Sequence, residues 1–302
     1  MSADRAAIPR VERLLALRSC STFRALAPLE LARMAEQLRP QWFAPGSELL
    51  RAGVPLGALA FLVRGEAELF VDRAARRVTP FSVLGDVADL LAEAPAARVI
   101  AQEPTLTLEL ERGAFEDLLE DEFGIFLGIL RAMAHELPCS REPAFGGGSG
   151  AELVLREPTE LGLVERILVL RHALEFAGAE IDALAELGRC CAEVALEPGA
   201  ALWRVGERSD DFLIVISGRV EARDAAESFA FEAGSAPGVL DSLARDARSF
   251  SATATSRVRA LSVPMHVLID VIEDHPQLGM KLLRAIARTG TNAAGRLAQR
   301  GT

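Results

Sequence analysis

Residues of the types that often perform catalysis are few in this sequence, and they are scattered. The four histidines lie in or beside segments with a helical pattern, at His135, His172, His266 and His275. A metal enzyme built on β-strands needs histidines clustered on those strands as ligands. The positions of the histidines do not form such a cluster, so we expect no metal site.

The four cysteines likewise show no pattern typical of a functional site. Cys20, Cys139, Cys190 and Cys191 lack the paired spacing of a metal site, and four are too few for a disulfide scaffold in 302 residues. Cys190 and Cys191 are adjacent on an expected helix, so they cannot share one of its faces. We expect ordinary thiols, either packed or half-exposed.

The glycine-rich run GGGSG at 146–150 is the nearest approach to a phosphate-binding loop, but no Lys-Ser/Thr pair follows it. No pairing of a nucleophile with a base stands out elsewhere, so we expect no enzyme. Together with three nearby prolines, the run predicts a flexible linker over residues 138–160. A loop inside a single domain is the alternative.

An internal repeat determines where any site would lie. Residues 44–70, APGSELLRAGVPLGALAFLVRGEAELF, have the same pattern as residues 197–223, EPGAALWRVGERSDDFLIVISGRVEAR. The offset is 153 residues at each matched position: Pro45 and Pro198, Gly46 and Gly199, Gly53 and Gly206, Gly65 and Gly218. A constant offset is the mark of a duplicated unit. We therefore expect two domains, 1–137 and 161–302, joined by the linker.

The order of elements is the same in both repeats. Two helical segments come first, at 11–18 and 29–38 and again at 164–171 and 182–191. Short apolar runs separated by glycines follow, which is typical of a sandwich or barrel of β-strands. A helical pattern closes each repeat, at 114–137 and 266–288. The sequence therefore predicts two domains that are mainly β with flanking α-helices.

The charge balance limits the partners. The net charge is −10, which opposes binding to the phosphate backbone of nucleic acids, so we expect no direct DNA binding. No apolar run approaches the roughly 20 residues that span a bilayer. We expect a cytoplasmic protein that does not insert into a membrane.

The segment 197–223, with the lead-in VERILVLR at 164–171, resembles the cyclic nucleotide-binding domain family. This family includes the catabolite activator protein and the regulatory subunit of cAMP-dependent protein kinase. The first repeat resembles it less closely. The resemblance implies two double-stranded β-helix (jelly-roll) domains flanked by helices. It also implies a cyclic nucleotide, cAMP or cGMP, as the possible ligand and no other cofactor.

The family binds its ligand at a phosphate cassette of the form Gly-Glu-x-Ala-Leu-Leu, followed by Pro-Arg-Ser/Ala-Ala. The resemblance implies that backbone N–H groups of a short helix face the cyclic phosphate, that the arginine pairs with it, and that the glutamate binds the ribose 2′-OH. In the second repeat this pattern falls on residues 238–249, here called the second cassette. The residues at the family's positions are Gly238, Val239, Leu240, Arg248 and Ser249.

The second cassette departs from the family at the glutamate position. Val239 stands there and offers the ribose no acceptor, which predicts an affinity weaker by roughly 1.5–3 kcal/mol. Gly238 is expected to begin a short helix, with Arg248 on the neighbouring strand directed into the same pocket. The alternative is a structural role in which Arg248 pairs with Asp241 or Asp246.

The first cassette, residues 85–96, departs further. Gly85 is kept and Asp86 replaces the glutamate, but Pro95 stands at the arginine position and is followed by Ala96. Arg98, three residues beyond Pro95, would face the other side of an extended strand. We expect this cassette to be empty.

Two functions fit these observations. In one, the second repeat binds a cyclic nucleotide and relays the change through its C-terminal helix to a protein partner or to a second copy in a homodimer. In the other, the two repeats form a scaffold for protein–protein interaction that binds no nucleotide. A change in melting temperature with added cAMP or cGMP would separate them.

Overall fold

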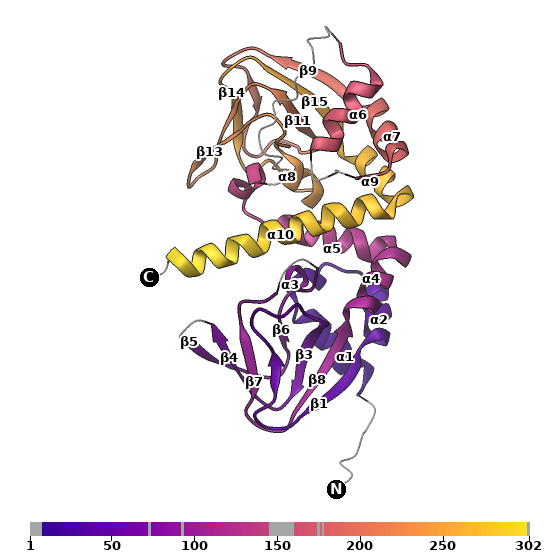
Figure 1. Ribbon diagram of the computed structural model, residues 1–302, viewed down its shortest axis with the longest axis vertical. Coiled ribbons are helices and arrows are strands. Elements are labelled where there is room, and N and C mark those ends of the chain that lie inside the picture. Colours follow the sequence, from indigo (N-terminus) through magenta and orange to yellow (C-terminus); the bar gives the residue numbers. More distant parts are fainter. Residues whose placement is uncertain are drawn as a thin grey trace. The chain divides into compact units, whose positions relative to one another are not determined.

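A computed structural model describes residues 8–71, 74–91, 94–144, 160–173, 176 and 178–300. The chain divides into two compact units, one of Met1–Ala132 with Ala294–Thr302 and the other of Met133–Ala293. In each repeat helices come first, the strands follow and helices close the repeat, in the order that the sequence predicts (Figure 1).

The first unit contains two antiparallel sheets with helices before and after them (Figure 1). One sheet has the order β1 (Arg39–Phe43), β8 (Thr105–Glu111), β3 (Ala58–Arg64) and β6 (Ser82–Leu84). The other has the order β2 (Glu48–Leu50), β7 (Arg98–Ala101), β4 (Ala67–Val71) and β5 (Ala74–Val78). The helices are α1 (Arg10–Arg18), the 3-10 turn η1 (Ser21–Phe23), α2 (Pro28–Gln37), α3 (Val87–Leu91), α4 (Arg112–Asp121) and α5 (Phe123–Glu136).

The second unit has the same architecture. Its sheets have the orders β11 (Asp211–Ser217), β15 (Val258–Pro264), β9 (Ala192–Leu196), and β10 (Ala201–Trp203), β14 (Ser251–Ala254), β12 (Val220–Arg223), β13 (Ser228–Phe231). Its helices are the 3-10 helix η2 (Cys139–Ala144), α6 (Leu163–His172), α7 (Ile181–Cys190), α8 (Val239–Ala244), α9 (Met265–Asp274) and α10 (Pro276–Arg300). The predicted class, mainly β with flanking helices, is confirmed.

The duplication extends to individual backbone contacts. Leu59 of β3 pairs with Leu110 of β8, and the residues 153 positions later, Phe212 and Val263, pair in the same register. An arginine also joins the first two helices of each repeat. Arg13 donates to the carbonyl oxygens of Ala35 and Leu38, and Arg166 donates to those of Gly188 and Cys191 at the same offset. These arginines satisfy carbonyl groups that the end of a helix leaves free.

The glycine that ends the third strand of each repeat is required by the backbone. Gly65 and Gly218 have φ angles of 88° and 92°, which residues with a Cβ rarely adopt. A Cβ at either position would also collide with the chain that crosses it, at Pro104–Thr105 or Arg257–Val258. The paired glycines that revealed the repeat therefore mark a close crossing of two chain segments.

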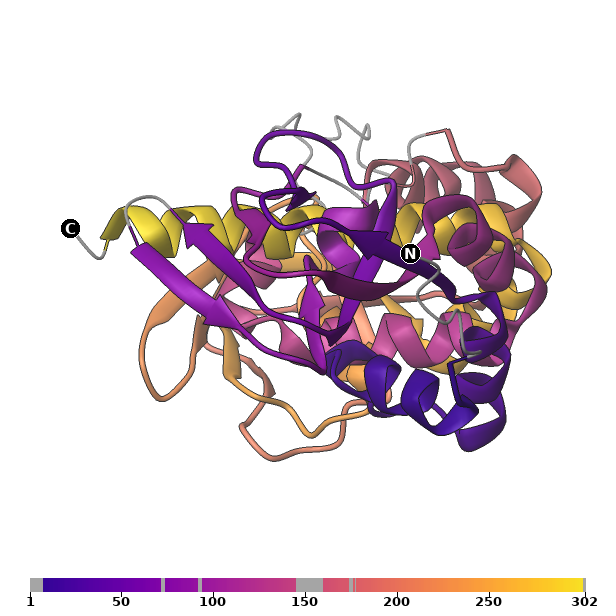
Figure 2. The ribbon, with the colours of Figure 1, turned by 90° about the horizontal axis from the view of Figure 1, so that it is seen from below.

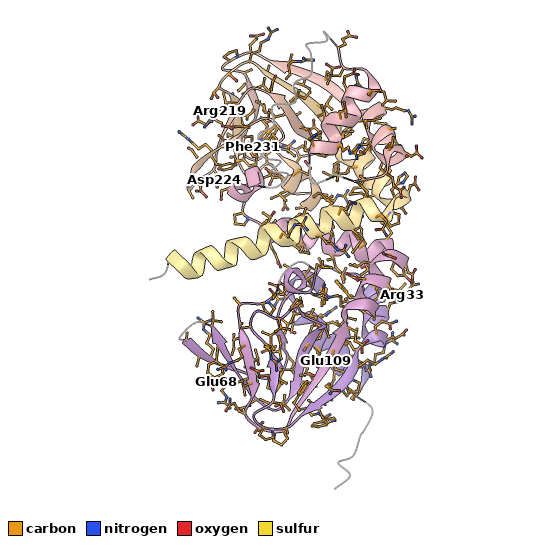
Figure 3. All side chains as sticks on the ribbon, viewed as in Figure 1. Arg33, Glu68, Glu109, Arg219, Asp224 and Phe231 are labelled. Carbon is orange, nitrogen blue, oxygen red and sulfur yellow. The ribbon has the colours of Figure 1, made fainter. Side chains whose placement is uncertain are left out.

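Aromatic side chains fill both interiors. In the first unit Phe23 lies 6.4 Å from Phe61 between ring centroids. The helices α1 and α2 of this unit, drawn in indigo in Figure 2, contact each other. In the second unit Phe231 is buried at the centre (Figure 3), where it stacks on Phe250 at 5.7 Å. These clusters contribute much of the apolar burial that stabilises each sheet pair.

Two expectations need correction. The closing helical pattern of each repeat is broken, at Glu122 and at His275, because the backbone there leaves the helical region. The segment 138–160 is not flexible throughout, because η2 begins at Cys139 and buries Glu142 completely. The run 145–159 lies outside the described residues. The domain boundaries at 137 and 161 stay a prediction.

The residues considered first as chemical groups lie outside the sheets. His135, His172 and His266 are on helices, and His275 follows α9. Cys190 is exposed and Cys191 is buried, as expected for neighbours on a helix. Within the described ranges no group of three or more His, Cys, Asp or Glu side chains is placed to hold a metal ion. A search of the same residues found no helix with the length and apolar character needed to cross a membrane.

Candidate functional site

Gly238 lies at the start of the short helix α8, as the sequence predicts. Its φ angle of 85° is in the left-handed region, which favours glycine. Space also requires glycine, since a Cβ would collide with a terminal nitrogen of Arg248 and lie 3.2 Å from the Trp203 ring. The turn before α8 therefore brings the helix N-terminus directly against Arg248.

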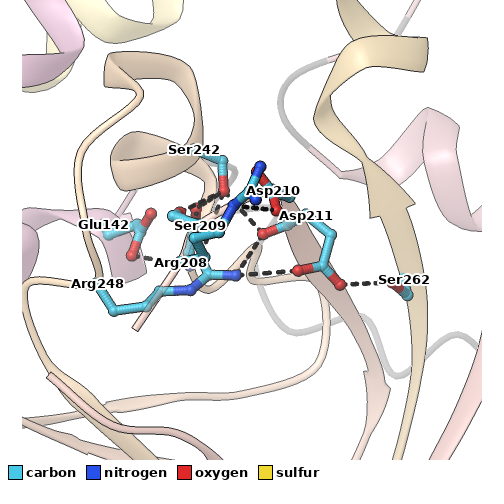
Figure 4. Close-up of polar contacts among 9 residues, drawn as sticks. Glu142, Arg208, Ser209, Asp210, Asp211, Ser242, Arg248 and Ser262 are labelled. Atoms are coloured by element: carbon cyan, nitrogen blue, oxygen red, sulfur yellow. Dashed lines mark hydrogen bonds and ion pairs between the residues drawn. The ribbon is translucent and has the colours of Figure 1, made fainter. Parts of the chain in front are cut away.

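Arg248 lies in the loop before β14, and not on the neighbouring strand as expected. Its side chain is 2% exposed. One terminal nitrogen, Nη1, donates to Gly238 O at 3.0 Å and lies 3.4 Å from Ser242 Oγ. The other, Nη2, donates to Asp211 O and to Asp211 Oδ1 at 3.1 Å (Figure 4). The guanidinium carbon lies 4.1 Å from the centroid of the Trp203 ring, in a cation–π contact.

The partners of Arg248 are themselves held in place. Ser242 Oγ lies 2.7 Å from both Asp211 O and Gly238 O, and 2.8 Å from Ser209 Oγ. Asp211 Oδ2 accepts a hydrogen bond from Ser262 Oγ at 2.9 Å (Figure 4). Burial lowers the pKa of Arg248, and the charge of Asp211 opposes that shift. The network positions the guanidinium within about one hydrogen-bond length of α8.

A structural role for Arg248 through an ion pair with Asp241 or Asp246 is not what the structure shows. The ion pair is made with Asp211, the first residue of β11. Asp241 instead accepts a hydrogen bond from Ser249 N at 3.0 Å. Asp246 contacts His135, with Oδ2 at 2.6 Å from Nδ1.

An acidic side chain occupies the N-terminus of α8. Glu142 of η2 accepts two backbone hydrogen bonds, from Gly238 N to Oε2 at 3.1 Å and from Leu240 N to Oε1 at 2.6 Å. Burial raises the pKa of Glu142 to about 8, although the two N–H groups act in the opposite direction. The free N–H groups of a helix N-terminus attract acids and anions. Glu142 therefore lies at the part of the cassette that the family resemblance assigns to the cyclic phosphate.

The other residues of the second cassette fall into two groups. Val239 and Leu240 are buried, Val239 completely, so only the backbone of this pair is available to a polar group. Ser249 is exposed, and both its backbone N–H group, at 3.0 Å, and its side chain interact with Asp241. The structure thus brings Gly238, Leu240 N and Arg248 together, whereas Ser249 is paired with Asp241.

The first cassette has the same backbone but different chemistry. Gly85 has a φ angle of 84° and precedes α3. Asp86 Oδ1 accepts from Asp89 N at 2.7 Å, and Asp89 Oδ2 accepts from Asp86 N at 3.2 Å. Two carboxylates at this helix N-terminus would repel a phosphate.

Backbone contacts verify which residue of the first repeat corresponds to Arg248. Gly206 N donates to Arg248 O at 2.8 Å, and Gly53 N donates to Pro95 O at 2.9 Å. The first cassette therefore has a buried proline at the arginine position, with the exposed Ala96 after it. Arg98 lies over the Phe70 ring at 4.9 Å.

Sequence reasoning missed four residues of the site: Glu142, Trp203, Asp211 and Ser242. For three of them a signal exists, because the corresponding residues of the first repeat are Leu50, Ala58 and Asp89. The two repeats thus differ together at these three positions around Arg248. Glu142 has no such signal, since it lies in a segment with the composition of a linker.

Comparison with known proteins finds similarity over part of the chain. Residues 193–275 match the family model described as the cyclic nucleotide-binding domain. A CRP-like cAMP-activated global transcriptional regulator of Mycobacterium tuberculosis is 32% identical over 126 residues, which are 40% of this chain and 56% of that protein. A cAMP-dependent protein kinase regulatory subunit of Colletotrichum orbiculare is 30% identical over 124 residues, 40% of this chain and 30% of that one.

Some solved structures are also similar to this chain. The regulatory subunit of a cAMP-independent protein kinase A from Trypanosoma brucei is 16% identical with a TM-score of 0.36, and the match covers 91% of each chain. The N-terminal domain of a transcriptional regulator from Streptomyces coelicolor is 25% identical with a TM-score of 0.37, over 41% of this chain and 94% of that one. Residues 193–275, most of the second repeat, are thus similar to the cyclic nucleotide-binding domain family, and the chain spans about half or less of the curated relatives that it matches.

Proposed function

We propose that this chain is a regulatory protein of tandem cyclic-nucleotide-binding-like domains, and that the second cassette takes up the cyclic phosphate of cAMP or cGMP. The observation that supports this most is the acid already bound there, since Gly238 N and Leu240 N hold both carboxyl oxygens of Glu142. The same backbone N–H groups can donate to a phosphate oxygen. Arg248 contacts the carbonyl of the same glycine and supplies the positive charge.

A second feature of Arg248 supports an anionic ligand. Its Nε is buried and has no hydrogen-bond partner among the described residues. A buried donor without an acceptor costs about 1–3 kcal/mol, so a phosphate oxygen within reach of it would recover that free energy. Because Val239 offers the ribose hydroxyl no acceptor, binding is expected to be weak.

The regulatory role in this proposal depends on the helices that follow the second cassette. In the second unit the chain continues from β15 into α9 and α10, which we propose as the contact with a protein partner or a second copy. The matched relatives are a transcriptional regulator and a kinase regulatory subunit, which is consistent with such a relay. A cytoplasmic location is part of the proposal.

The test is the melting temperature with and without millimolar cAMP or cGMP, using AMP as the control ligand. A ligand that binds only the native state must raise the melting temperature. Arg248→Ala should abolish the shift, whereas Arg219→Ala should keep it. Arg219 is an exposed arginine of the same unit that pairs with Glu232. No shift with either nucleotide in the wild-type protein would contradict the proposal.

A non-binding scaffold is the second candidate, and one observation favours it. Both terminal nitrogens of Arg248 already bind protein oxygens, and Glu142 already fills the helix N-terminus. These donors therefore need no ligand to be paired. The absence of any nucleotide effect on a folded protein would select this function.

A further inference from the structure

The chain segment that carries Glu142 makes several polar contacts with the rest of the second unit. Glu142 binds Gly238 N and Leu240 N, and Cys139 Sγ donates to Asp224 Oδ2 at 3.3 Å. His135 Nδ1 lies 2.6 Å from Asp246 Oδ2. Of these, only the Glu142 contact is completely buried. It is therefore the contact from which solvent is most fully excluded.

The Glu142 contact uses donors that a ligand would also need. Each backbone N–H group has a single hydrogen to donate. Gly238 N and Leu240 N therefore cannot donate well-aligned hydrogen bonds to a carboxyl oxygen and to a phosphate oxygen at the same time. Both N–H groups are buried, so losing Glu142 without replacement would leave them unpaired. An anionic ligand and Glu142 must therefore exclude each other.

We propose that Glu142 is an internal occupant of the second cassette, which fills the place of a ligand's anionic group and thereby holds Cys139–Ala144 against the second unit. The part of this inference that concerns competition rests on the proposed function. The part that concerns the hold on the segment does not. A nucleotide binds only the fraction of molecules in which Glu142 has left, and this lowers its apparent affinity by that fraction.

Cys139 provides a local measure of whether the segment is in place. It is half-buried, and burial raises the pKa of its thiol to about 11, so it should react slowly while η2 is docked. When the segment is released, the thiol becomes exposed and its pKa returns toward the ordinary value. The labelling rate of Cys139 with a maleimide, read on its own peptide by mass spectrometry, therefore reports docking with or without a ligand.

The experiment compares full-length wild type, Glu142→Ala, Glu142→Gln and the control Glu136→Ala. Glu136 is an exposed glutamate at the end of α5, six positions before Glu142. Each protein is titrated calorimetrically with cAMP and with cGMP, and the Cys139 labelling rate is measured with and without 1 mM of each nucleotide, about the concentration needed for a weak site.

We expect Glu142→Ala to bind nucleotide at least about tenfold more tightly than wild type and to label at Cys139 at least about tenfold faster without ligand. Nucleotide should also accelerate labelling in wild type. Glu136→Ala should match wild type in both measurements. Glu142→Gln keeps the size and one acceptor oxygen, so it should lie between wild type and Glu142→Ala, and it replaces the alanine variant if that fails to fold.

Three outcomes decide the matter. If wild type and Glu142→Ala bind nucleotide equally and label equally, the inference is overturned while the proposed function stands. If no variant binds nucleotide, the proposed function fails and labelling alone decides. Faster labelling in Glu142→Ala but not in Glu136→Ala then supports Glu142 as the internal occupant, and unchanged labelling overturns it.

Discussion

Arg248 illustrates how the surroundings of a residue determine what it can do. A guanidinium with 2% exposure is stabilised only if its donors find acceptors, and Gly238 O and Asp211 provide them. The same side chain is the cation that a cyclic phosphate would need. The residue therefore serves the fold and the proposed site at once.

Removing Arg248 should therefore reduce stability even without a ligand. Arg248→Ala breaks hydrogen bonds to a charged donor, which are worth about 1.5–3 kcal/mol, and we expect the free energy of unfolding to fall by about 2–3 kcal/mol. Urea denaturation measures this. The control Arg219→Ala removes an exposed ion pair and should change stability by less than about 1 kcal/mol. Equal effects of the two substitutions would show that the network around Arg248 contributes no more than an exposed ion pair.

The pKa of Glu142 predicts how stability depends on pH. The ordinary pKa of this carboxyl is 4.5, and burial raises it to about 8 in the folded protein. Between these two pH values the folded protein keeps a proton that the unfolded chain has lost. Stability should therefore fall as pH rises from 4.5 to about 8.

Glu142→Gln cannot titrate, so its stability should depend less on pH in this window. His135 and Asp241, whose pKa values are also raised, are present in both proteins and cancel in the difference. Urea midpoints at pH 5 and pH 8 give the comparison. Parallel changes in wild type and Glu142→Gln would contradict the assignment.

Single residues of the site could be predicted to different extents. Gly238 and Arg248 were predictable because the family pattern names both positions. Asp211 was not, because its partner lies 37 residues away and the sequence offered the nearer Asp241 and Asp246. Glu142 was not, because its role depends on donors almost a hundred residues later in the chain.

At the scale of elements, the turn into α8 is the part of the cassette that most restricts which residue can be accommodated. Gly238 and Gly234 both have positive φ angles, 85° and 89°, but only at Gly238 does a Cβ meet other atoms. Gly234→Ala should cost about 1–3 kcal/mol for backbone strain alone. Gly238→Ala carries the same strain and also displaces the hydrogen-bonded Arg248 side chain.

We therefore expect Gly238→Ala to be the more destabilising substitution by at least about 1 kcal/mol in urea denaturation, the scale of one lost hydrogen bond. The proposed nucleotide site should be lost in Gly238→Ala and kept in Gly234→Ala. A smaller effect at Gly238 than at Gly234 would show that Arg248 moves aside without cost.

The strands could be predicted from the sequence, and the helix ends only in part. Gly65 and Gly218 mark strand ends because the backbone there excludes a side chain, and this constraint is local. The break at His275 also has a local cause, because Pro276 disfavours the helical region at the residue before it. The break at Glu122 has no proline after it. The short helix η2 was missed because its partners lie far away in the sequence.

At the scale of the whole chain, the two repeats share a backbone and differ in chemistry. We expect at most one nucleotide to bind per chain, because Pro95 brings no charge and Asp86 and Asp89 fill the N-terminus of α3. Calorimetric titration of the full chain should fit a single site. The variant Arg248→Ala should show no remaining binding, and residual heat from a second site would contradict the assignment of an empty first cassette.

The position of Glu142 in the chain has a further consequence. Only a few residues separate it from the end of α5, so its carboxyl competes as a tethered group with an effective concentration on the order of millimolar. The nucleotide concentration at which such a protein responds is then set by the length of the tether as much as by contacts in the cassette. Insertions between Leu137 and Glu142 would tune the response threshold without altering any residue that touches the nucleotide.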